Sequence, residues 1–121
     1  MREWLAVACG GAVGSLLRWQ VGRLVDRGAL PWATLTVNVT GSFLVGALVA
    51  FGITAARAPL WQLLLVTGFA GGFTTWSAFN QELLELLRAG QVARALGYAG
   101  LTLLASLAGA AAAAALARPA T

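Results

Sequence analysis

Four long apolar stretches, separated by charged residues and proline, constrain this chain more than any other feature. They cover about residues 4–25, 33–55, 60–88 and 92–117. A helix needs roughly 20 apolar residues to cross the hydrocarbon core of a bilayer. Of the 121 residues, 60% are hydrophobic and 10% are charged, which leaves room for four such helices and no soluble domain. The sequence therefore predicts an all-α integral membrane protein with a single membrane domain, residues 1–121.

The third stretch differs from the others because small and hydroxyl residues interrupt it. Three glycines are followed by three hydroxyl side chains: Gly68, Gly71 and Gly72, then Thr74, Thr75 and Ser77. Nearby glycines weaken a helix, and hydroxyl groups can pair the backbone groups that a break releases. We therefore expect a break in the third helix, and interrupted membrane helices often bind ions. Close packing between helices would explain the same small residues and stays open as an alternative.

The composition argues against several functional classes. The chain has no histidine and only one cysteine, Cys9, which lies in an apolar run. The commonest general base is therefore missing, and no disulfide or cysteine metal cluster can form within one chain, so we do not expect an enzyme. All eight basic residues are arginines scattered singly along the sequence, which argues against nucleic acid as a partner. We predict a retained first helix, and nothing in the sequence resembles alternating barrel strands or an organelle transit peptide, so we expect the cytoplasmic (inner) membrane of a prokaryote, with lipid around the protein.

The arginines give almost no preference for one orientation in the membrane. With four spans, Arg2, Arg57 and Arg118 fall on one side, and Arg23, Arg27, Arg88 and Arg94 fall on the other, joined by Arg18 if it is counted. The positive-inside rule then sets only a weak bias. Such a chain could insert both ways and pair as an antiparallel homodimer with its two-fold axis in the membrane plane. Dimerisation is also favoured because four short helices alone can hardly enclose a polar path.

Polar side chains inside the spans are the best functional candidates, because each is costly in a bilayer unless it is paired. Tyr98, Thr102 and Ser106 are spaced by four, so they form a hydroxyl stripe on one helix face. The stripe could line a solvated vestibule or make ordinary hydrogen bonds between helices. Arg18 could snorkel towards the headgroups or direct its charge into a water-filled entrance.

Two aromatic rings follow the expected break. Trp76 and Phe79 are three residues apart and share a face beside Ser77. Core packing is the simpler interpretation, but the positive edges of the rings could also replace part of an anion's hydration. Asn38 could add an amide donor, and Ser77 a hydroxyl.

Three segments resemble the Fluc (CrcB) family. They are Gly10-Gly-Ala-Val-Gly-Ser-Leu-Leu-Arg18, Thr34-Leu-Thr-Val-Asn-Val-Thr-Gly-Ser-Phe43 and Gly68-Phe-Ala-Gly-Gly-Phe-Thr-Thr-Trp-Ser-Ala-Phe79. The last stretch is similar to the family mainly through Tyr98, Thr102 and Ser106. This sequence departs from the family pattern at Trp76, where the family usually has Phe, and at Ala78, where it often has Thr.

The resemblance implies a fluoride-selective channel that lowers cytoplasmic fluoride by passive, electrodiffusive export. It implies an antiparallel, dual-topology homodimer with two pores, each built from both subunits. By position, the pore residues would be Asn38, Trp76, Ser77, Phe79, Tyr98, Thr102 and Ser106, with Arg18 near an entrance. A structural sodium ion would lie at the dimer centre, held by the backbone carbonyls of Gly71 and Thr74.

Two other functions compete with this interpretation. A small multidrug-type, proton-coupled transporter has similar length and topology but needs a membrane-embedded carboxylate in its first helix, where this chain has only Glu3 at the start. Glu82 and Glu85 are expected near the end of the third helix, so no acidic residue is placed in the middle of a span. A structural or assembly subunit would carry no flux and would leave Asn38 and the Thr-Thr-Trp-Ser segment unexplained.

Overall fold

The computed structural model of the chain describes residues 1–25, 28 and 30–117, and every regular element within them is helical. The elements are α1 (Arg2–Val25), α2 (Trp32–Ala50), α3 (Pro59–Trp61), the π-helix η1 (Gln62–Ala70), α4 (Gly71–Phe73), α5 (Trp76–Arg88) and α6 (Val92–Leu116). Arg27 and Arg118, which entered the orientation argument, lie outside the described residues. The fold is thus all-α over the described part of the chain.

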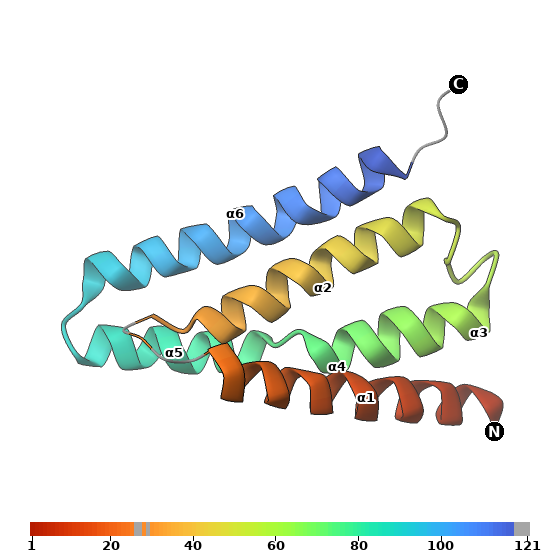
Figure 1. The fold of residues 1–121 in the computed structure, drawn as a ribbon, viewed down its shortest axis with the longest axis horizontal. Coiled ribbons are helices and arrows are strands. Elements are labelled where there is room, and N and C mark those ends of the chain that lie inside the picture. Colours follow the sequence, from red (N-terminus) through yellow and green to blue (C-terminus); the bar gives the residue numbers. More distant parts are fainter. Residues whose placement is uncertain (26–27, 29, 118–121) are drawn as a thin grey trace.

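Two pairs of helices build the bundle, and glycines let each pair approach closely. Helix α1 lies along α3, η1 and α4, while α2 lies along α6 (Figure 1). A Cβ atom on Gly10 would overlap the carbonyl oxygen of Leu64, and one on Gly14 would overlap that of Phe69. Gly46 of α2 meets the backbone of Ala110 in the same way. The Gly-x-x-x-Gly step of the sequence therefore packs helix against helix within the chain.

Two helices are long and apolar enough to cross a membrane. These are α2, with a mean hydropathy of 1.6, and α6, with a mean hydropathy of 1.8. Helix α1 has 24 residues but also contains charged residues in both its first and its last turn. The third predicted span is divided into shorter elements. Among the described residues, length and composition therefore single out two spans, where the sequence pattern predicted four.

The second helix ends earlier than the predicted residue 55. It stops at Ala50, because Gly52 adopts a φ of +85° that only glycine takes up easily. The Gly52 N–H donates to the Val49 carbonyl, and the Ile53 N–H donates to the Leu48 carbonyl, which is a Schellman motif. The prediction relied on the later Arg-Ala-Pro segment and overlooked this glycine stop.

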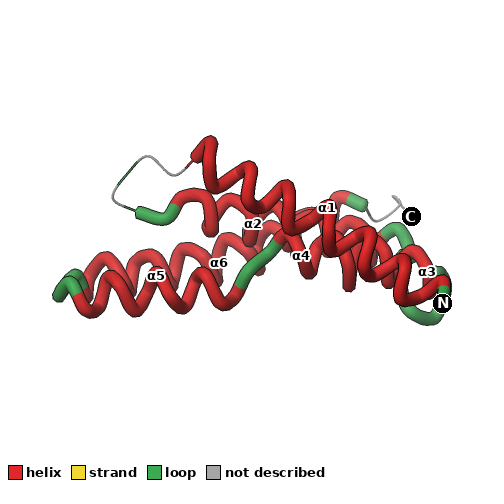
Figure 2. Tube along the Cα trace, turned by 90° about the horizontal axis from the view of Figure 1, so that it is seen from below, coloured by secondary structure: helices red, strands yellow, loops and turns green. Residues whose placement is uncertain are grey.

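The third helix is broken, and the break lies after the glycines rather than at them. Gly71 and Gly72 stay helical, while Thr74 (ψ 161°) and Thr75 (φ −151°) are extended before α5 begins at Trp76. Figure 2 shows this loop in the middle of the bundle. β-Branched threonine tolerates extended backbone well, whereas the glycines are needed for close contact with α1. The π-helical turn of η1 was not expected from the sequence.

Candidate functional site

Asn38 of α2 pairs the backbone that the break releases. Its Oδ1 accepts a hydrogen bond from the Thr75 N–H at 2.8 Å, and its Nδ2 donates to the Thr75 carbonyl oxygen at 3.1 Å. One side-chain amide thus satisfies both backbone groups of an extended residue inside the bundle. Because the amide nitrogen carries two hydrogens, Asn38 keeps one further N–H to offer.

The first turn of α5 starts at the break with a side-chain cap. Thr75 Oγ1 accepts a hydrogen bond from the Ala78 N–H at 3.1 Å and lies 3.3 Å from Ser77 Oγ. A helix N-terminus presents backbone N–H groups and the positive end of the helix dipole. The break therefore directs an electropositive helix end into the bundle, and such ends favour anions.

Polar groups of α1 pair the carbonyl side of the break. Arg18 Nη1 donates to the Thr74 carbonyl oxygen at 3.3 Å, and Ser15 Oγ donates to the Gly72 carbonyl at 3.5 Å. The Arg18 guanidinium is half-buried, so the structure places its charge at the break. The sequence left Arg18 either at the headgroups or at a water-filled entrance, and the contact that the structure shows is with the Thr74 carbonyl.

A cavity of about 220 Å³ opens beside the break. It is lined by Asn38, Ser42, Thr74, Thr75, Trp76, Thr102, Leu103 and Ser106. Among the described residues, Thr102 Oγ1 and Ser106 Oγ are the buried side-chain oxygens without a hydrogen-bond partner. Buried polar groups are normally paired, so two unpaired hydroxyls at one cavity indicate a site that binds a polar species. The structure thus brings two members of the predicted stripe together with Asn38.

The aromatic residues are placed differently from one another. The Phe79 ring is 2% exposed and packs between Trp76 and Tyr98, with ring centroids 5.1 Å and 5.3 Å away. Trp76 is 64% exposed, and Ser77 is exposed as well, on the surface of the single chain. Trp76 lines the cavity beside the break, whereas Phe79 lies in the packed interior next to it.

Glu82 is the site residue that the sequence reasoning missed. Its Oε2 accepts a hydrogen bond from the Tyr98 hydroxyl, and its Oε1 accepts one from the Thr34 hydroxyl, both at 2.6 Å. Glu82 was expected near the end of a helix over residues 60–88. Because the helix restarts at Trp76, it lies instead in the middle of α5. Its spacing of three from Phe79, and hence a shared helix face, was the available signal.

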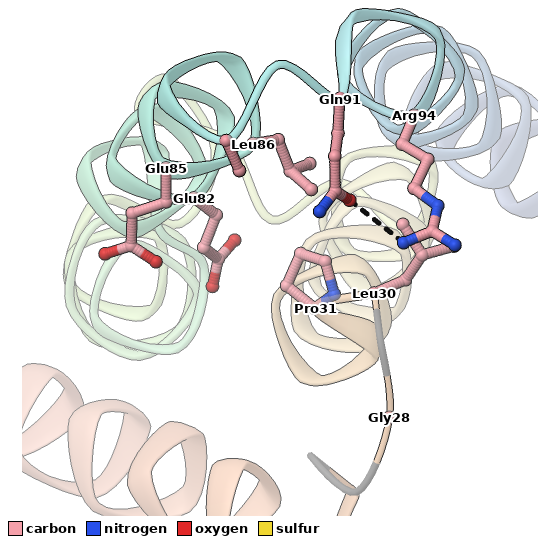
Figure 3. Close-up of a pocket in the computed structure, with 9 residues that line it drawn as sticks. Gly28, Leu30, Pro31, Glu82, Glu85, Leu86, Gln91 and Arg94 are labelled. Atoms are coloured by element: carbon pink, nitrogen blue, oxygen red, sulfur yellow. Dashed lines mark hydrogen bonds between the residues drawn. The ribbon is translucent and has the colours of Figure 1, made fainter.

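A second and larger cavity, of about 410 Å³, lies where α5 turns into α6. Figure 3 shows Glu82, Glu85 and Arg94 on its walls, together with Gln91. The Arg94 guanidinium donates a hydrogen bond to Gln91 Oε1 at 2.9 Å. Among the described residues, the lining of this cavity thus includes two carboxylates and one guanidinium.

The predicted sodium ligands, the carbonyls of Gly71 and Thr74, lie at the carbonyl side of the break. In a continuous helix the Thr75 N–H would pair with the Gly71 carbonyl, but here it donates to Asn38 instead. The Thr74 carbonyl already accepts from Arg18, although a carbonyl oxygen has a second lone pair. Oxygen ligands of this kind fit a small hard cation. Among the described residues no group of three His, Cys, Asp or Glu side chains could hold a metal ion.

Comparison with known proteins places the chain in a family. Residues 5–115 match the family model described as CrcB-like protein, Camphor Resistance (CrcB). A protein of Bordetella petrii named fluoride-specific ion channel FluC is 45% identical over 107 residues, which are 88% of this chain and 84% of the relative. The protein of the same name from Thermus thermophilus is 47% identical over 103 residues, 82% of either chain. FluC 2 of Bacillus licheniformis is 48% identical over 88 residues, 73% of this chain and 67% of the relative. The chain belongs to the CrcB family.

Proposed function

We propose that this chain forms a fluoride-selective ion channel. The relatives named as fluoride-specific channels support this function, and one observation in the structure carries it. Thr102 and Ser106 leave two buried hydroxyls unpaired at a cavity beside the N-terminus of α5. Hydroxyl protons and a helix N-terminus can replace the water around a small anion without a fixed charge strong enough to trap it.

Transport through such a site is passive. Hydrogen fluoride crosses membranes as a neutral molecule and dissociates in the cytoplasm, and the inside-negative membrane potential then drives fluoride out through a selective pore. The protein's contribution is to replace the strong hydration of fluoride while excluding larger anions. Chloride must be excluded, because its flow would collapse the potential.

The working unit is an antiparallel homodimer of four-span subunits in a prokaryotic inner membrane. The large exposed area of Trp76, at 64%, and the exposed Ser77 support this proposal. Trp76 lines the cavity beside the break and Ser77 follows it in the sequence, so a second copy that covered both would close the open side of that cavity. The paired subunits would form two pores, each with walls from both chains.

A sodium ion at the centre of that dimer would complete the structure. The Gly71 carbonyl, whose helical donor has been diverted to Asn38, supports such a site. The Gly71 and Thr74 carbonyls would hold the ion, which would supply positive charge where the carbonyl ends of two broken helices meet.

Anion efflux from liposomes tests the proposed function. Purified protein is reconstituted with sodium present, and one batch is loaded with fluoride and the other with chloride. Fluoride efflux without chloride efflux is the expected result. Absence of both fluxes would refute a channel, and equal fluxes would refute selectivity for fluoride.

A further inference from the structure

The carboxylate of Glu82 connects three helices through two hydroxyl groups. Thr34 of α2 donates to one carboxylate oxygen and Tyr98 of α6 donates to the other, both at 2.6 Å. This is the short distance of a charge-assisted O–H to O⁻ hydrogen bond. Thr34 is 6% exposed and Tyr98 is 4% exposed, so water competes little for either bond. The protons of both hydroxyls are therefore committed to the carboxylate.

We propose that Glu82 is a positioning residue that decides which hydroxyls of the stripe can donate to fluoride. A hydroxyl group has only one proton to donate. Because Tyr98 gives its proton to Glu82, it can present only oxygen lone pairs and its ring to an anion. Thr102 and Ser106 donate to no carboxylate; the Thr102 hydroxyl lies close enough to Tyr98 to interact with its oxygen, and a fluoride ion would compete for that proton. The inference rests on the proposed function, and it shortens the donating part of the stripe from three residues to two.

Charged groups of both signs lie near Glu82. Glu85 on its own helix and Arg94 on α6 line the same cavity (Figure 3). Helix α2, which supplies Thr34, contains no charged residue. Arg88, in the last turn of α5, lies at the same end, so the charges there do not by themselves select one part of the stripe. The hydrogen-bond geometry therefore places the donating stretch at Thr102 and Ser106.

The hydrogen bond of Tyr98 can be observed directly, because it is the only tyrosine of the chain. The Raman doublet of the phenol ring distinguishes a tyrosine that donates strongly from one that accepts. We expect the wild-type channel in lipid to show a strong donor, with or without fluoride. Glu82→Leu removes both acceptors at similar volume and should abolish that signature. The matched control Glu85→Leu removes a carboxylate of the same cavity that accepts from Gln81 instead, and should leave the doublet unchanged.

Fluoride efflux gives the second test. Tyr98→Phe should slow efflux much less than Thr102→Val does, because the lost proton is not offered to the ion. Thr102→Val should slow efflux by about tenfold or more, since it removes a hydrogen bond to a charged species. In a Glu82→Leu background the Tyr98 hydroxyl is released, and Tyr98→Phe should then slow efflux at least about fivefold.

The outcomes separate this inference from the function on which it rests. Two results would overturn the role of Glu82 in a working channel. One is a wild-type Raman doublet typical of a tyrosine that donates only weakly. The other is fluoride efflux through Tyr98→Phe that is as slow as efflux through Thr102→Val. Neither measurement needs Glu82→Leu, so both still test the role of Glu82 if that variant fails to fold. Absence of wild-type fluoride efflux would refute the function, whereas the Raman measurement would still show where the Tyr98 proton lies.

Discussion

The pairing of Asn38 with the break gives the sharpest stability prediction. Asn38→Ala removes the two hydrogen bonds that satisfy the N–H and the carbonyl of Thr75. Each buried group left without a partner costs about 1–3 kcal/mol. The Thr75 N–H can regain a partner by rewinding towards the Gly71 carbonyl, which lowers the total. We therefore expect a loss of about 2–4 kcal/mol in the free energy of unfolding, with the carbonyl as the main uncompensated group.

The assay is reversible unfolding in mixed micelles, with the denaturing detergent as the variable. Asn80→Ala serves as the matched control, because Asn80 is an exposed asparagine on α5. The control should unfold within about 0.5 kcal/mol of wild type. Equal stabilities of Asn38→Ala and Asn80→Ala would refute the reasoning, because they would mean that the break is satisfied without Asn38.

Three further predictions follow from the packing and charges around the break. Gly14→Ala should destabilise the chain by at least about 2 kcal/mol through overpacking. Gly22→Ala should not, because nothing lies within 4 Å of the added methyl group. Equal thermal stabilities of the two variants would contradict this prediction. Thr75→Val should lower the free energy of unfolding by about 1 kcal/mol, because it removes the cap of α5. An unchanged midpoint in the same detergent titration would mean that the cap is irrelevant. Arg18→Gln should slow fluoride efflux by about fivefold or more, since it removes the positive charge at the Thr74 carbonyl; an unchanged rate in the liposome assay would place that charge away from the ion's path.

Residue periodicity was enough to predict the helical architecture and to place two of the residues that line the cavity on one helix face. Spacing by four put Thr102 and Ser106 on one face, and the structure places both at one cavity. The cluster of small and hydroxyl residues predicted the interruption of the third helix. These features depend on local backbone geometry, which short sequence patterns encode.

The remaining features depend on contacts between segments far apart in the sequence. Nothing local shows that Asn38 pairs with Thr75, or that Arg18 reaches the Thr74 carbonyl. Moving the break to Thr74 and Thr75 also changed where Glu82 lies along its helix, and so hid the carboxylate to which Tyr98 donates. With Glu82 expected near the end of the third helix, nothing in the sequence placed its carboxylate beside Tyr98.

Fluoride efflux from liposomes containing Thr102→Val, Ser106→Ala or the control Thr36→Val tests the central claim most directly. Thr36 is an exposed threonine whose hydroxyl bonds within α2. The account predicts that both cavity variants slow fluoride efflux by about tenfold or more while Thr36→Val keeps the wild-type rate. Wild-type rates in both cavity variants would contradict it, because fluoride would then cross without the two unpaired hydroxyls.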